Sequence, residues 1–499
     1  MFKDIFKAAL MTKKILLLIT FFFFLLMDSA LLSANLLCQA EEFKLGATKT
    51  SMTPPPGSII GDSYGIRVSE GVHDELYIKT LVFEHGGEKV AFITLDVVSL
   101  PHLLVMKSRQ LIHQQTGIAV NNIILNATHA HAGPQMNPLF WDVVGGSAKL
   151  KSQEYTNNLP ELIMASVKSA VSKIQPVRVS VGSVQEKQIS FNRRYLMKDG
   201  TFKTNPGKLN PNIVRPAGPI DPALSIVYFE SLDKKPIAIL VNFALHVAVV
   251  GGNRFSSDFP GVMSELIGKV KGDDVVTIFT NGTSGNINHV DVSNPNQLSG
   301  FDESRRIGTV LAGRVLSALP SLRSIPIKSL KAKIQTVHLP VFRTVDRSEA
   351  DWAKGVISKF GKPDSHGFAD VVSAWRILDL VKYQGGLETR HKSTTTVPLT
   401  EDGTALESEV SVIAFGDQMA LVGFPGDAFV ELGLGIKLNS PYPFTIVTEQ
   451  SGNGTISYMP NKKAFPEGQY EVNSVRYSSG GGEALAESAI ETLISIFYR

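Results

Sequence analysis

The chain has 499 residues, 43% hydrophobic and 19% charged, which supports a well-buried globular core and excludes a disordered chain. The net charge is +3, and residues 1–40, with four Lys and two Asp, hold most of it, so the body is nearly neutral. A nucleic-acid partner is therefore not expected, because it would need a strongly basic surface. Cys38 is the only cysteine, which excludes disulfides, thiol nucleophiles and cysteine-based zinc sites. Any metal must be held by His, carboxylate or Tyr.

Residues 1–40 have the pattern of an export signal peptide. Lys13 and Lys14 precede a thirteen-residue apolar run, Ile15 to Met27, and the small residue Ala40 ends the segment. A basic start, a short apolar stretch and a small-residue end are typical of secretory signals. The run is shorter than the about 20 apolar residues that a spanning helix needs. We expect a secreted or periplasmic protein, with a signal-anchored membrane protein as the alternative.

Apolar runs alternate with helical patterns through the rest of the chain. The segments expected to form strands are Val90–Leu95, Asn122–Leu125, Ile237–Phe243 and Val275–Phe279. The segments expected to form helices are Leu103–Thr116, the region around Ile163–Ile174, Phe259–Val270 and Glu483–Phe497. This alternation predicts an α/β fold in which mixed β-sheets and flanking helices form one large domain over residues 42–499. Residues 345–395 are expected to form a helix-rich cap or insertion.

Polar clusters follow several of the predicted strands. The first contains His129 and His131, directly after an apolar run. In an extended chain, side chains two residues apart share a face, so both imidazoles are expected to point the same way. Both can bind a metal, or one can bind it while the other moves protons. Two surface histidines in a loop are the alternative.

Two further clusters lie near the middle of the chain. His246 follows the predicted strand 237–243, where a lone histidine is more often a core residue with a satisfied hydrogen bond. The Gly- and Asn-rich turn at 281–289 can direct backbone N–H groups at an anion, although an ordinary turn is the alternative. Ser284 lies in this turn but lacks the Gly-x-Ser-x-Gly pattern of a nucleophile elbow.

Two late segments carry an acid and two tyrosines. Asp427 follows an apolar strand in a Phe-Pro-Gly-Asp turn, and Tyr470 comes twelve residues after Tyr458. Taken alone, Asp427 is typical of a turn and Tyr458 of a half-buried aromatic residue.

Together these motifs resemble the neutral/alkaline non-lysosomal ceramidase family over most of residues 43–480. The Thr-His-x-His-x-Gly-Pro motif at 128–134 is the most specific element, and the segments 53–55 and 71–74 also match. Members of this family are zinc amidases that split the amide of N-acylsphingosine. The resemblance implies a neutral-ceramidase-like catalytic domain with one zinc ion per chain. It also implies a lipid or small-molecule N-acyl substrate, with peripheral membrane contact for access to it, but specifies no oligomeric state.

The resemblance also implies a role for each candidate site residue. The residues that would hold the zinc ion are His129, His246, Asp427 and Tyr458. His131 would be the acid/base group beside the metal. Arg193 would face the substrate, Tyr470 would be a second active-site tyrosine, and Asn288 occupies a substrate-facing position. On chemical grounds, Arg193, Tyr470 and the backbone N–H groups of residues 285–288 are candidates to hold the oxyanion. These roles imply zinc-hydroxide attack on the amide carbonyl, with His131 returning the proton to the leaving amine.

Two residues depart from the family pattern. Asp427 stands where the family has glutamate, and Asn288 stands where it has serine, which excludes a covalent serine mechanism at that position. The chain is also expected to lack the family's C-terminal immunoglobulin-like module. The alternatives are a metallohydrolase of the same fold acting on a different amide or ester, and a non-catalytic exported binding protein. A third alternative, phosphate-ester hydrolysis, would favour a second metal, for which His73, Asp74 and Asp96 could supply ligands.

Overall fold

The computed structural model describes residues 1–3, 7, 11, 42–61, 66–384, 399–454 and 456–498. The chain divides into two compact units, Met1–Glu42 and Phe43–Arg499. The expected signal segment lies almost entirely outside the described residues, and so do residues 385–398 of the expected cap. Within the described ranges, every helix is too short or too polar to span a bilayer.

The second unit is built on two β-sheets. The larger sheet has nine strands, in the order β16-β14-β13-β8-β1-β5-β6-β7, with β18 paired to β8. Its strands are β1 (Lys44–Ser51), β5 (Tyr77–His85), β6 (Glu88–Leu95), β7 (Ile123–Ala127), β8 (Gln175–Gln185), β13 (Ala223–Ser231), β14 (Pro236–Phe243), β16 (Val276–Asn281) and β18 (Arg323–Ile325). The smaller sheet contains β19 (Leu330–Pro340), β20 (Ala405–Phe415), β21 (Met419–Gly423) and β23 (Phe444–Thr448), in that order. Both sheets mix antiparallel and parallel pairs, which confirms the predicted fold class.

The two sheets pack face to face around a shared apolar core. Phe83 and Phe229 of the larger sheet meet Phe415 and Leu421 of the smaller one. The rings of Phe83 and Phe415 meet edge to face, 4.9 Å between centroids. Each fully buried side chain of this kind contributes about 1.5–3 kcal/mol. Because helices cover the outer faces, strands are buried on both sides, which explains why several appear in the sequence as unbroken apolar runs.

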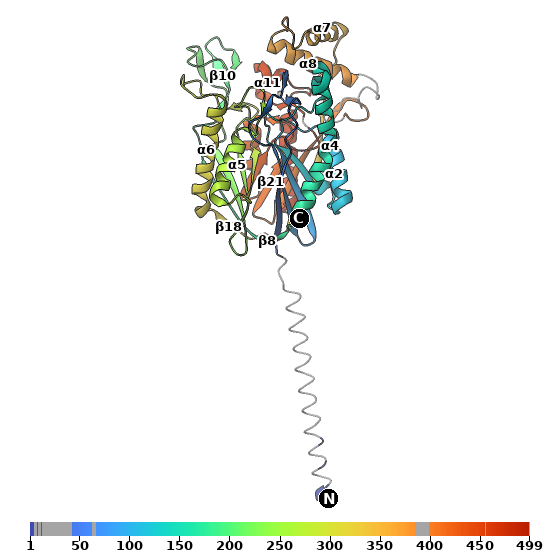
Figure 1. The fold of residues 1–499 in the computed structure, drawn as a ribbon, viewed down its shortest axis with the longest axis vertical. Coiled ribbons are helices and arrows are strands. Elements are labelled where there is room, and N and C mark those ends of the chain that lie inside the picture. Colours follow the sequence, from blue (N-terminus) through green and yellow to red (C-terminus); the bar gives the residue numbers. More distant parts are fainter. Residues whose placement is uncertain are drawn as a thin grey trace. The chain divides into compact units, whose positions relative to one another are not determined.

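Helices form the outer layers (Figure 1). The larger sheet is covered by α2 (His102–Thr116), α4 (Gly146–Val171), α5 (Asp258–Lys271) and α6 (Gly300–Ala318). The smaller sheet is covered by α10 (Val430–Asn439) and α12 (Gly481–Phe497). The predicted helices at 103–116, 259–270 and 483–497 agree with α2, α5 and α12 to within two residues. The unit is therefore layered as helix, sheet, sheet and helix.

Two helices in the expected cap region, α7 (Arg347–Ser358) and α8 (Phe368–Gln384), lie together at one end of the unit (Figure 1). They pack on α3 (Pro138–Val144), where the Phe140 ring stacks on Trp375 at 5.2 Å. Phe140 and its neighbour Trp141 are both buried, so they are core residues. A small sheet of β11 (Phe202–Thr204), β10 (Arg194–Met197) and β12 (Ile213–Pro216) lies at the same end.

Two glycines of α6 provide a matched test of the helix packing. A Cβ at Gly308 would lie 2.6 Å from the Cβ of Val262 on α5, whereas one at Gly313 would meet no atom within 4 Å. We expect Gly308→Ala to lower the free energy of unfolding by about 1–3 kcal/mol, because overpacking strains the contact. Gly313→Ala should raise it by about 0.5–1 kcal/mol, because alanine favours a helix. Urea unfolding measures both, and equal effects would contradict this packing.

Candidate metal centre

The three candidate histidines lie on loops that follow strands of the larger sheet. His129 and His131 follow β7 at one end of the strand order, and His246 follows β14 near the other end. The sheet curls so that β16, the neighbour of β14, also lies against β6 and β7. Loops from opposite edges of one sheet are thereby brought to the same place.

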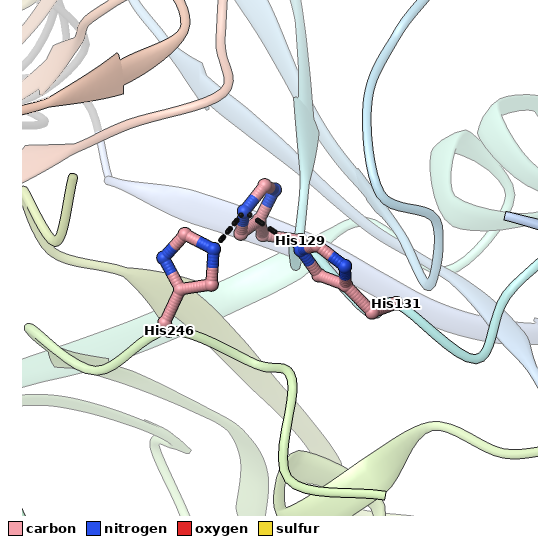
Figure 2. A group of neighbouring side chains, drawn as sticks. All are labelled: His129, His131 and His246. Carbon is pink, nitrogen blue, oxygen red and sulfur yellow. Dashed lines mark hydrogen bonds between the residues drawn. The ribbon is translucent and has the colours of Figure 1, made fainter. Parts of the chain in front are cut away.

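The imidazoles meet at their Nε2 atoms. His129 Nε2 lies 2.9 Å from His246 Nε2 and 3.2 Å from His131 Nε2 (Figure 2). Asp427 Oδ1 also lies 3.2 Å from His129 Nε2. The expected extended chain at 129–131 is wrong, because His129 has a φ of +67° and belongs to no strand. The two rings of this motif therefore meet because the backbone turns at His129.

Backbone carbonyls orient two of the rings. His129 Nδ1 donates to the carbonyl O of Val98 at 2.7 Å, and His246 Nδ1 to that of Ser284 at 3.4 Å. Because a carbonyl only accepts, each Nδ1 carries the proton and each Nε2 presents a lone pair. Two facing lone pairs repel unless a cation lies between them. Two nitrogens that each bind a tetrahedral zinc ion at about 2.0–2.1 Å lie about 3.3 Å apart. The Nε2 separations in this cluster are similar, so the histidines fit such an ion.

Burial keeps these two rings neutral. His129 and His246 are 2% and 3% exposed. Burial lowers the pKa of His129 to about 4, although the charge of Asp427 opposes the shift. Burial, with His129 and Arg193 adding to the effect, also lowers the pKa of His246 well below its usual range. The neutral imidazole is the form that binds a metal.

Asp427 and Tyr458 lie side by side in a short parallel pair of strands, β22 (Asp427–Ala428) and β24 (Tyr458–Met459). They occupy paired positions, so their side chains project from the same face. The Tyr458 ring is parallel to the ring of His246, with centroids 6.5 Å apart. Burial raises the pKa of the Tyr458 hydroxyl, and the charge of Arg193 opposes the shift. The acid and the phenol expected as ligands thus lie beside the histidines.

The turn at 281–288 packs directly on Asp427. Gly285 N–H donates to Ala428 O at 2.7 Å, and a Cβ at Gly285 would collide with the backbone oxygen of Asp427. Only glycine permits this approach. Ile287 N–H donates to Ser284 O at 2.9 Å. These two N–H groups are used within the fold and are unavailable to an oxyanion, contrary to expectation.

Arg193 and Tyr470 lie next to Tyr458. The Arg193 guanidinium is 5.3 Å from the ring centre of Tyr458 and 5.8 Å from that of Tyr470. The two tyrosine rings are 5.1 Å apart, edge to face. On its outer side, Tyr470 meets Phe368 at 5.2 Å. A row of aromatic rings therefore leads from the buried Tyr458 to Phe368, which is 58% exposed.

One buried carboxylate positions Arg193 and Tyr470 together. Glu471, fully buried, follows Tyr470 in α11 (Gln469–Asn473). Its Oε1 accepts from Arg193 Nε at 2.9 Å, and its Oε2 accepts from a terminal nitrogen of Arg194 at 2.9 Å. Removing one partner from such a buried pair is costly, about 3–5 kcal/mol. The network holds the helix of Tyr470 against the strand ends around Arg193.

Asn288 lies in β17 (Ile287–Asn288), which pairs with β9 (Phe191–Asn192), next to Arg193. Its Nδ2 donates to Asn205 Oδ1 at 2.8 Å, and its Oδ1 accepts from Val290 N–H at 3.0 Å. Both polar atoms of this side chain therefore stabilise the surrounding turns.

The residues considered for a second metal lie outside the histidine group. Across the described ranges, His129, His131 and His246 make the only cluster of three or more potential His, Cys, Asp or Glu ligands. Asp74 instead accepts from Ser256 Oγ at 2.5 Å and pairs with His73 Nδ1 at 2.8 Å. Asp96 accepts from Tyr77 N–H at 2.9 Å. Their hydrogen bonds are those of structural residues.

Sequence reasoning missed Glu449, which directly follows β23. This fully buried carboxylate contacts the Ser284 turn and the backbone after Asp427. Burial, followed by the charge of Asp427, raises its pKa. Its position directly after a strand could have identified it, because the other polar clusters of the site also follow strand ends.

Comparisons with known proteins give a consistent result. Residues 43–298, just over half of the chain, match the family described as neutral/alkaline non-lysosomal ceramidase, N-terminal. The neutral ceramidase of Pseudomonas aeruginosa is 25% identical over 231 residues, which are 44% of this chain and 32% of that protein. The match thus spans about a third of the curated relative's length.

Solved structures show the same fold. The crystal structure of neutral ceramidase from Pseudomonas aeruginosa aligns with a TM-score of 0.67 and 17% identity, over 92% of this chain and 75% of that chain. A structure of ceramidase complexed with C2 aligns with a TM-score of 0.67 and 16% identity, over 92% and 76%. With the family match covering more than half of its residues, this chain belongs to the neutral/alkaline non-lysosomal ceramidase family.

Proposed function

We propose that this protein is an exported zinc-dependent amidohydrolase that cleaves the amide of a ceramide-like N-acyl lipid. The observation that carries the proposal is the meeting of a buried imidazole, a third imidazole and a carboxylate at His129, each with an atom within 3.2 Å of His129 Nε2. Membership of the ceramidase family supports an amide as the bond that is cleaved.

The residues that would hold the zinc ion are His129, His246, Asp427 and Tyr458. A bound zinc ion lowers the pKa of water to about 7 and so provides a nucleophile at neutral pH. His131, at the more exposed side of the cluster, takes a proton from water at Nε2 and returns it to the leaving amine. The charge of Arg193 and the hydroxyl of Tyr470 stabilise the carbonyl oxygen as it becomes negative, a role worth about 3–4 kcal/mol per donor in known cases.

The exposed Phe368 beside Tyr470 supports a substrate with a hydrocarbon portion. Asp427 and Asn288, which replace the family's glutamate and serine, favour a second candidate, a different amide or ester cleaved at the same site. Initial rates on N-acylsphingosine, a short N-acyl amino sugar and a matched ester separate the two. A preference for the sugar or the ester would replace the lipid in this proposal.

Export is proposed from the basic and apolar pattern of residues 13–40. Both the compact unit and the family match begin at residue 43, so neither includes this segment. N-terminal sequencing of the protein recovered from the host is the test. A mature chain that begins near Glu41 supports a cleaved signal, and an intact Lys13-Lys14 in the membrane fraction supports the anchored alternative.

We expect His129→Ala to lose zinc and activity together, because the other groups of the cluster meet around this ring. His131→Ala should retain zinc but lose at least about 10²-fold in kcat, the usual contribution of an acid/base group. Elemental analysis of the purified proteins and amidase assays measure both. His338→Ala, at a 59% exposed side chain on β19, is the control and should change neither. A normal zinc content in His129→Ala would overturn the ligand assignment.

Metal-free protein should lose stability in acid. The pKa of His129 is about 4 in the folded state and 6.5 when unperturbed, so between these values the unfolded chain binds more protons. The free energy of unfolding should therefore fall as the pH decreases from 6.5 to 4. Urea unfolding of EDTA-treated protein at pH 7 and pH 4.5 measures the loss, and His129→Gln should reduce it. An unchanged loss in that variant would contradict a lowered pKa for this ring in the folded state.

A further inference from the structure

Glu449 is a buried carboxylate whose two oxygens are both fully engaged. Oε1 accepts from Asn281 Nδ2 at 2.9 Å and from Ser284 Oγ at 2.6 Å. Oε2 accepts from the backbone N–H groups of Ser284 at 2.9 Å and Ala428 at 3.1 Å. No Lys, Arg or His in the described ranges forms an ion pair with it, so neutral hydrogen-bond donors alone hold it.

These contacts reach the backbone beside two of the candidate zinc ligands. Ser284, held by Glu449 through both its N–H and its hydroxyl, presents the carbonyl that accepts from His246 Nδ1. Ala428, held through its N–H, directly follows Asp427. One carboxylate therefore fixes the ring orientation of one ligand and the strand position of the other.

Gln450, the residue after Glu449, also links this segment to the candidate zinc ligands. The amide of Gln450 donates to Asp427 Oδ1, and its backbone has a φ of +57°, a conformation that costs energy for a non-glycine residue. Its carbonyl accepts from Ala127 N–H at 3.0 Å, two residues before His129. Displacing Glu449 would therefore also disturb the chain leading to His129.

We infer that Glu449 is a positioning residue that sets the geometry of the metal centre without binding the metal. The inference rests on the proposed function, because it assumes that the histidine cluster takes zinc. Its physical basis is the set of three N–H donors on the carboxylate, which an isosteric amide cannot satisfy. In Glu449→Gln, an NH₂ group replaces one of the two oxygens. It would then face either Asn281 Nδ2 or the backbone N–H groups of Ser284 and Ala428, and two hydrogen-bond donors would face each other without an acceptor.

The test is the zinc affinity of Glu449→Gln, measured by competition with a chromogenic chelator. We expect a loss of about 10–100-fold, the usual effect of removing an outer partner of metal ligands. The visible spectrum of the cobalt-substituted protein should also change, because it reports ligand geometry. Glu186→Gln is the matched control. Glu186 is equally buried, accepting from Gln188 N–H and Arg314 Nε, and its replacement should leave zinc affinity and the cobalt spectrum unchanged.

If Glu449→Gln does not fold, Ser284→Ala decides, because it removes the hydroxyl that donates to Glu449 and accepts from Asn281 Nδ2, and it keeps the backbone contacts to Glu449. It should lower zinc affinity about three- to tenfold, the value of one hydrogen bond. Wild-type affinity and an unchanged cobalt spectrum in the folded Glu449→Gln protein would overturn the inference and leave the proposed function intact. Absence of zinc binding by the wild-type protein would instead overturn the proposed function itself.

Discussion

The candidate site depends on a three-residue segment, Glu449–Ser451, that joins strand ends from opposite edges of the larger sheet. At the end of β16, Glu449 N–H donates to Asn281 O at 3.0 Å, and at the end of β7, Ala127 N–H donates to Gln450 O at 3.0 Å. Asn126 and Ser451 form an isolated antiparallel bridge. The smaller sheet thus contributes the connection that holds the loops of His129 and His246 against each other.

Buried asparagines make this junction specific. Asn126 in β7, Asn242 in β14 and Asn281 in β16 each donate a side-chain amide to the end of β23, at Glu449 O, Val447 O and Glu449 Oε1. A buried amide that loses its partner is costly, so only one register of the two sheets satisfies all three. Their packing therefore determines where the histidines meet, as well as burying apolar surface.

Local pattern was enough to predict much of the fold, whereas the roles of the candidate residues came from the family resemblance. Strands β6, β14 and β16 were expected within two residues of their observed bounds, because unbroken β-branched runs between turn residues are a strong local signal. The junction itself could not be predicted, because Glu449 and Asn126 are 323 positions apart and nothing in either segment identifies its partner. The turn at His129 was missed for a related reason, since a positive φ at a non-glycine residue is imposed by the surrounding structure.

Positive φ values recur beside the candidate site residues, which indicates that the surrounding structure determines the backbone there. Gln450 next to the Asp427 contact, Ser457 before Tyr458 and Gln469 before Tyr470 all adopt them, as His129 does. Each such residue costs of order 1–3 kcal/mol, which persists only where the surroundings over-determine the conformation. The hydrogen bonds to Glu449 constrain the chain entering Gln450, and the pairing of β22 with β24 constrains the chain leaving Ser457.

Because the side chain of Asp427 is short, the position of its backbone matters more. A carboxylate on one methylene has little rotamer freedom with which to reach a metal, so its backbone must already be in place. That backbone is held by its pairing with Tyr458, by the N–H of Ala428 on Glu449 and by the close approach of Gly285. Aspartate can thus occupy this position because the strand beneath it is fixed from three sides. The same fixation makes the site sensitive to Glu449, which does not contact the cluster of Nε2 atoms itself.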